Sequence, residues 1–134
     1  MKGMDIAARA RALVGTRFRP QGRSRQHGLD CVGTAAAAAG VPAGRVPSGY
    51  TLRGQRLPEI ERGLCGLGCK PVAGRAVRPG DIAVCRAGPA QFHMAVIVPG
   101  AFVHADASLR RVVERPLPLP WPVVGYWRAG EEEM

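Results

Sequence analysis

The sequence predicts an α+β fold in which N-terminal helices pack on an antiparallel sheet of about six strands. An amphipathic segment over 5–14 and an alanine-rich run that ends at Gly40 have the character of helices. Beyond residue 72, short runs rich in β-branched and aromatic residues are separated by turn residues, a pattern typical of strands. This arrangement favours an α+β domain over a helical bundle.

The length and composition are those of one small domain. The 134 residues fall within the usual size of a single domain, and 46% apolar residues are enough to form one core. Aromatic residues make up only 5%, whereas the chain holds 18 glycines and 12 prolines. We therefore expect a single domain over residues 1–134, with its core at 5–128, built from Ala, Val and Leu with many short connections.

Start and stop signals mark the helices. Gly15 ends the first helix, Asp30 can cap the N-terminus of the second, and Pro58 lies near the start of the third. The segment 17–28 is polar and contains glycine, so we expect a loop that lines the approach to Cys31. The predicted helices are 5–14, 31–40 and 57–64.

The second half of the chain contains only strand signals. Antiparallel pairing of successive runs predicts a meander packed against the helix that begins at Cys31. The proline-rich segment 116–122 resembles a ligand for a recognition groove, but a rigid connector between two strands is the favoured interpretation. The predicted strands are 72–77, 81–85, 92–98, 102–104, 111–114 and 123–127.

Cys31 is the candidate nucleophile. It follows Asp30 directly and stands on the first turn of the predicted helix. Unpaired backbone N–H groups and the positive end of the helix dipole favour a thiolate there, and the thiolate is the nucleophilic form of cysteine. A structural cysteine would be more typical in the middle of an apolar stretch. We therefore interpret Cys31 as a catalytic thiol.

Two histidines complete the candidate site. His93 and His104 lie in strand-like runs joined by the turn pair 99–100, so the two side chains can face each other. One imidazole can take the proton of a thiol while the other holds it in the correct tautomer. The chain contains no asparagine, which excludes an Asn in the orienting role. His104 is the favoured orienting residue, with Gln91 and Asp106 as alternatives.

Four motifs in order resemble those of the NlpC/P60 cysteine peptidases, in particular their phage-type branch. In that family an Asp-Cys pair on a helix precedes a Gly-Asp pair that opens a strand, and two histidines follow. The resemblance covers about residues 5 to 128 and extends to the upstream segment 15–22. The matching segments are Leu29-Asp30-Cys31-Val32-Gly33, Pro79-Gly80-Asp81-Ile82-Ala83-Val84, His93-Met94-Ala95-Val96 and Val103-His104-Ala105.

The resemblance implies a papain-like NlpC/P60 fold and a cysteine endopeptidase. Its substrates would be peptide bonds in bacterial peptidoglycan stem peptides, commonly between D-glutamate and a diamino acid. Cys31 would be the nucleophile, His93 the base and His104 the orienting residue, with no cofactor and no metal. Because no secretory segment precedes the first helix, we expect cytoplasmic synthesis. Delivery to the cell wall by a phage tail or gene-transfer particle, or release at lysis, would then follow.

One position departs from the family pattern. Many bacterial members carry a tyrosine where Phe18 aligns, and its hydroxyl is thought to help bind the oxyanion. Phe18 has no hydrogen-bond donor, and losing one such donor typically costs on the order of a hundredfold in rate. Tyr50 and Gln21 are candidate replacements. Two alternatives stay open: a weak or inactive structural, wall-binding component of a phage-like particle, and a papain-like amidase or acyltransferase.

The remaining histidine and cysteines are weaker candidates. His27 lies in the polar loop without a rigid strand to fix its position. Cys65 and Cys69 lack a second closely spaced ligand pair of the kind typical of zinc sites. A disulfide between them would need an oxidising compartment, so reduced thiols are the favoured state. Cys85 is interpreted as a small core residue.

The charge of the chain favours anionic partners. Nineteen basic and ten acidic residues give a formal net charge of +9, spread along the chain. For a wall hydrolase the partners would be teichoic acids, lipopolysaccharide phosphates or stem-peptide carboxylates. No aromatic residues are interleaved with the arginines, so specific nucleic-acid binding is not predicted. No apolar run approaches the roughly 20 residues of a membrane span.

Overall fold

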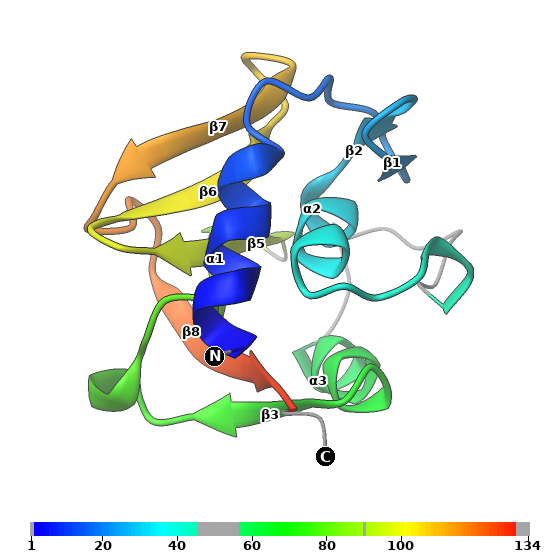
Figure 1. Cartoon of the computed structure of the whole chain (residues 1–134). Coiled ribbons are helices and arrows are strands. Elements are labelled where there is room, and N and C mark those ends of the chain that lie inside the picture. Colours follow the sequence, from blue (N-terminus) through cyan, green and yellow to red (C-terminus); the bar gives the residue numbers. More distant parts are fainter. Residues whose placement is uncertain (1, 46–56, 90, 131–134) are drawn as a thin grey trace.

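A computed structural model describes residues 2–45, 57–89 and 91–130 of the chain. In this part, three helices and a six-stranded sheet form the α+β fold that the sequence predicts (Figure 1). The helices are α1 (Lys2–Ala12), α2 (Cys31–Ala38) and α3 (Leu57–Gly66), and the strands are β1 (Arg23–Ser24), β2 (Gly28–Leu29), β3 (Cys69–Val72), β4 (Ile82–Gly88), β5 (Gln91–Val98), β6 (Ala101–Asp106), β7 (Arg111–Pro116) and β8 (Val123–Ala129).

The six strands are antiparallel in the order β3-β8-β4-β5-β6-β7. The predicted strand number is confirmed, but the simple meander is wrong because β8 returns to lie between β3 and β4. The strand predicted over 72–77 is wrong in its bounds, because β3 covers Cys69–Val72 and Gly74–Ala76 forms a 3₁₀ turn. This turn carries the chain away from β3 before β4 begins. The gap is filled by β8, whose Arg128 side chain donates to the carbonyl of Ala76 at 2.9 Å.

The main core lies between the sheet and helices α1 and α2. Ile6 and Ala10 of α1 and Ala35 and Ala38 of α2 are buried against apolar strand residues such as Val96. Alanine side chains add little width, so the two helices can lie close to the sheet and to each other. The core therefore holds the first turn of α2 directly against the strands.

A smaller core covers the other face of the sheet. It contains Ala83, Cys85, Ala95, Ile97 and Phe102, which confirms that Cys85 is a core residue. The segment between β7 and β8 acts as the predicted connector and also packs its apolar side chains on this face. Those side chains are Leu119 and Trp121.

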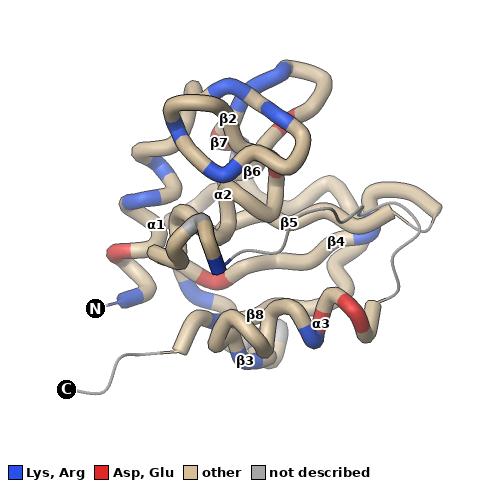
Figure 2. Tube along the Cα trace, turned by 90° about the vertical axis from the view of Figure 1, so that its right-hand side faces the viewer, with Lys and Arg blue, Asp and Glu red and all other residues tan. Residues whose placement is uncertain are grey.

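Basic residues are spread over the fold rather than gathered in one block. Figure 2 shows them on α1, around β2 and near β3. In the described part of the chain, no helix is both long enough and apolar enough to cross a membrane.

We predict that Asp81→Asn lowers the free energy of unfolding by about 3 kcal/mol, because it breaks a buried ion pair. The Asp81 carboxylate is 1% exposed and accepts from Arg128 Nε and Nη2 at 2.8 and 2.9 Å. Urea unfolding followed by circular dichroism measures the change. The matched control is Glu114→Gln, which removes an exposed pair with Arg11 and should cost less than about 1 kcal/mol. Equal losses in both variants would contradict the prediction.

Candidate active site

The carboxylate of Asp30 fixes the start of α2. Its Oδ1 accepts a hydrogen bond from the backbone N–H of Gly33 at 2.7 Å, which confirms the predicted N-cap. The same carboxylate accepts from Arg23 Nη1 at 3.1 Å and from the backbone N–H of Gln21 at 3.1 Å. One buried acid thus ties the preceding loop to the helix that carries Cys31.

The loop lies against the helix with no space between the two backbones. A Cβ added to Gly33 would overlap the carbonyl oxygen of Gly22. Glycine is therefore needed at position 33 for close approach rather than for an unusual backbone angle. This contact places the polar loop, which also contains the short β1–β2 hairpin, beside the first turn of α2.

Cys31 lies at the first position of α2 and is 5% exposed. Burial raises the pKa of its thiol to about 12, although the backbone N–H groups of Met94, Val32 and Cys31 itself oppose the rise. This direction is opposite to the sequence-based expectation of a thiolate at the helix start. The physical reason is that the first turn of α2 packs against the sheet, so desolvation outweighs the helix-end N–H groups. The resting group is therefore a neutral thiol.

The Cys31 sulfur lies next to the backbone N–H of Met94, at a point of β5 where β6 is no longer paired with it. These strands pair only from Val96 opposite Val103 to Val98 opposite Ala101. Ile97 donates its N–H to Asp81 on the β4 side, so the N–H groups of even-numbered residues in β5 face the β6 side. Met94 lies beyond the last paired residue, and its N–H is directed to the Cys31 sulfur instead.

The structure brings the two predicted histidines together. His93 Nε2 and His104 Nδ1 are 2.8 Å apart, and the rings meet edge to face with centroids 5.0 Å apart. Trp121 packs against both rings, at 4.9 and 5.2 Å between centroids. The sequence did not predict this tryptophan in the site. The available signal is a lone large aromatic residue in the connector between β7 and β8, which follow one another in the chain but are not neighbours in the sheet.

Both imidazoles are neutral at pH 7. Burial lowers the pKa of His93 to about 4, and the neighbouring His104 adds to the fall while Asp106 opposes it. Burial also lowers the pKa of His104, with Asp106 again opposing and Arg115 adding to the fall. A neutral imidazole has one donor and one acceptor nitrogen, so the pair can pass a proton only if the two tautomers are matched.

Cys31 and the histidine pair contact adjacent residues of β5. The side chain of Met94 shares the main core with Cys31, and alternation along the strand turns His93 to the other face, against Trp121. Within the described ranges, no hydrogen bond joins Cys31 to His93 or His104. The catalytic assignment of these three residues stays a prediction.

The other sequence candidates lie elsewhere or in structural roles. His27 is exposed in the β1–β2 turn, where its Nδ1 is 3.1 Å from Ser24 Oγ. Phe18 is partly buried against the main core, and Gln21 uses its backbone N–H on Asp30. Tyr50 lies outside the described residues. In the described part, no group of three His, Cys, Asp or Glu residues is arranged to hold a metal ion.

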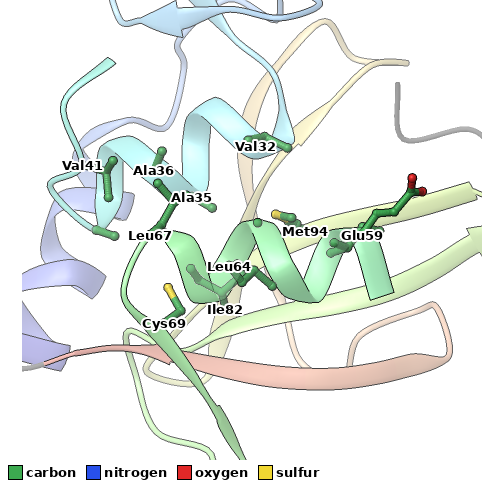
Figure 3. A pocket seen from close by; sticks show the side chains of 13 residues that line it. Val32, Ala35, Ala36, Val41, Glu59, Leu64, Leu67, Cys69, Ile82 and Met94 are labelled. Atoms are coloured by element: carbon green, nitrogen blue, oxygen red, sulfur yellow. The ribbon is translucent and has the colours of Figure 1, made fainter. Parts of the chain in front are cut away.

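An apolar pocket adjoins the thiol. It lies between α2, α3 and the sheet and has a volume of about 230 Å³ (Figure 3). Val32 and Met94, the neighbours of the Cys31 sulfur, line it together with Leu64 and Ile82. Glu59 is the one carboxylate among the described lining residues. The pocket can therefore hold an apolar group.

No protein-family model matches the sequence, and no curated protein matches it. Solved structures do resemble the chain. NlpC2 from Trichomonas vaginalis superposes with a TM-score of 0.69 at 18% identity, over 96% of this chain and 46% of that protein. NlpC1 from the same organism superposes with a TM-score of 0.65 at 20% identity, over 95% of this chain and 43% of that protein. The NlpC/p60 domain of the peptidoglycan hydrolase SagA superposes with a TM-score of 0.57 at 20% identity, over 87% of this chain and 90% of that domain.

The chain has the fold of an NlpC/P60 domain. It spans less than half the length of the two Trichomonas proteins but matches most of the isolated SagA domain. The predicted NlpC/P60 fold is therefore confirmed. These similarities say nothing about a phage-type origin, which stays a prediction.

We predict that Gly33→Ala lowers the free energy of unfolding by about 1 to 3 kcal/mol, because its Cβ forces the loop away from α2 in the NlpC/P60 fold. Chemical denaturation measures the loss. Gly63→Ala is the matched control, since a Cβ at that helical position meets nothing within 4 Å. It should gain roughly 0.5 to 1 kcal/mol from helix propensity. A gain in both variants would show that the loop does not press on α2.

We also predict that iodoacetamide alkylates Cys31 slowly at pH 7 and faster with each step toward pH 10. The raised pKa keeps the thiol protonated below this range, and only the thiolate reacts well. Peptide mapping by mass spectrometry separates Cys31 from the exposed Cys65, whose reaction serves as the internal reference. A rate for Cys31 that is constant between pH 5 and 8 would instead indicate a thiolate–imidazolium pair at rest.

Proposed function

We propose that this protein is a cysteine endopeptidase that cleaves peptidoglycan stem peptides, at the bond between D-glutamate and a diamino acid. The observation that carries the proposal is the 2.8 Å contact between His93 and His104, at the end of β5 where Met94 holds the Cys31 sulfur. The NlpC/P60 fold and the four ordered motifs support the same assignment.

In the proposed reaction, Cys31 Sγ attacks the carbonyl carbon while His93 Nδ1 takes the thiol proton. Nε2 of His93 is engaged by His104, so Nδ1 is the nitrogen left for this transfer. The backbone N–H of Cys31, at the helix start, stabilises the negative charge that develops on the carbonyl oxygen. His93 then gives the proton to the leaving amine as the C–N bond breaks. Water, deprotonated by His93, hydrolyses the thioester and restores the thiol.

Partners and delivery follow from the same proposal. A net charge of +9 suits attraction to the phosphates and carboxylates of a cell wall. The phage-type resemblance supports synthesis in the cytoplasm and delivery by a phage tail or gene-transfer particle, or release at lysis.

The apolar pocket favours a second candidate function, amidase or acyl-transfer chemistry on a substrate with an aliphatic group. An apolar cavity of 150 Å³ is known to hold benzene, so about 230 Å³ accommodates a short alkyl chain. Val32 and Met94 would bring such a chain next to the sulfur. This candidate predicts that Cys31 is acylated faster by an octanoyl ester than by an acetyl ester of the same alcohol.

We predict that the protein releases new amine termini from purified stem peptides, and that Cys31→Ser and His93→Ala each lower kcat/KM by at least about 10³-fold. Removing the nucleophile or the base eliminates the covalent route. Mass spectrometry of the products measures cleavage, and His27→Ala is the control that should retain full activity.

Three outcomes of this experiment are distinct. Cleavage that is lost in the Cys31 and His93 variants supports the peptidase. Octanoyl transfer to Cys31 without any new amine terminus supports the second candidate. Wall binding without either reaction identifies a structural component of a particle, in keeping with the missing hydroxyl at Phe18.

A further inference from the structure

His104 has one ring nitrogen with an unusual environment. The side chain is buried, and its Nε2 has no hydrogen-bond partner among the described residues. The nearest acidic atom is Oδ2 of Asp106, at 3.9 Å. A buried polar atom without a partner is costly, so it calls for an explanation in the site itself.

The Asp106 side chain is held in place by the turn between β6 and β7. Its Oδ1 accepts from the backbone N–H of Ser108 at 2.9 Å and from that of Leu109 at 3.0 Å. The carboxylate cannot rotate away without losing both bonds. Its second oxygen therefore stays directed at His104, and a shift of roughly 1 Å would close the 3.9 Å gap to a hydrogen bond.

We propose that Asp106 is a positioning residue that fixes the tautomers of both histidines and so leaves His93 Nδ1 unprotonated. An ionised carboxylate only accepts, so it favours the proton on His104 Nε2. His104 Nδ1 is then an acceptor, and the 2.8 Å contact requires that His93 Nε2 donate to it. The lone pair of His93 Nδ1 is left for the thiol. The inference rests on the proposed function for its catalytic meaning.

The opposite arrangement would disable the base. If His104 carried its proton on Nδ1, that nitrogen would donate to His93 Nε2, and the proton of neutral His93 would have to lie on Nδ1. His93 would then have no acceptor for the thiol proton. The sequence predicts Asp106 only as an alternative to His104 in the orienting role, whereas the structure places its carboxylate beside Nε2 of His104, the nitrogen that does not contact His93.

Charged groups around the pair agree with this role. Asp106 on β6 raises the pKa of both histidines, and Arg115 on β7 opposes it at His104. Trp121, from the segment between β7 and β8, packs an uncharged ring against both histidines. Asp106 is thus the carboxylate that stabilises positive charge on the pair when His93 takes up a proton.

The test uses Asp106→Asn, which retains a side-chain oxygen for the turn and removes the charge. In ¹⁵N-histidine spectra of the whole chain at pH 7, the wild-type protein should show protonated Nε2 and unprotonated Nδ1 in both His93 and His104. The variant should show mixed tautomers, a lower pKa for both histidines and a loss of about 10- to 100-fold in kcat/KM with KM little changed. The signals that disappear in His27→Gln belong to the third histidine, so those that remain belong to His93 and His104.

Glu114→Gln, which removes a neighbouring carboxylate that pairs with Arg11, is the control and should leave tautomers and activity unchanged. Protonated Nδ1 on His104 in the wild-type protein, or unchanged tautomers in Asp106→Asn, would overturn the inference. If the variant fails to fold, the tautomers seen in the wild-type spectrum still test the inference. Tautomers that depend on Asp106 in a protein without peptidase activity would refute the proposed function and leave the positioning role intact.

Discussion

The buried carboxylate of Asp30 is the constraint on which the geometry of the candidate site depends. It caps α2 and accepts from the loop at Gln21 and Arg23, so helix, loop and thiol are placed together. Each of these bonds involves an ionised acceptor, which makes it stronger than a neutral one. An apolar residue at position 30 would leave three donors without this partner and free the first turn of α2. The Asp-Cys pair is therefore a structural unit as well as a chemical motif.

Features with a local cause could be predicted from the sequence. The Asp30 cap, the burial of Cys85 and the strand that contains His93 follow from neighbouring residues and alternation. Features set by contacts between distant parts of the chain could not be predicted from the sequence. The insertion of β8 depends on pairing with both β3 and β4, and Trp121 joins the histidines only because of that path. The raised pKa of Cys31 depends on burial against the sheet, and the N–H of Met94 that opposes the rise lies some sixty residues away in the sequence.

Burial gives this site a different resting state from that expected of an exposed helix-end thiol. Desolvation acts on Cys31 and on His93 in opposite directions, and both effects favour the uncharged form. In the proposed reaction, charge then develops only when a substrate is present to accept the attack. In such a dry environment, the N–H groups around the sulfur act more strongly on that charge than they would in water. The chemistry is thus linked to the arrival of the substrate.

The position of β8 couples assembly of the candidate site to a late segment of the described chain. This strand separates β3 from β4, and the segment leading into it brings Trp121 against the two imidazoles. A nascent polypeptide that stops before residue 121 has its thiol and both histidines but not the indole that covers them. Contacts of such long sequence separation form late in folding because of their entropic cost. The candidate site is therefore complete only once β8 has docked.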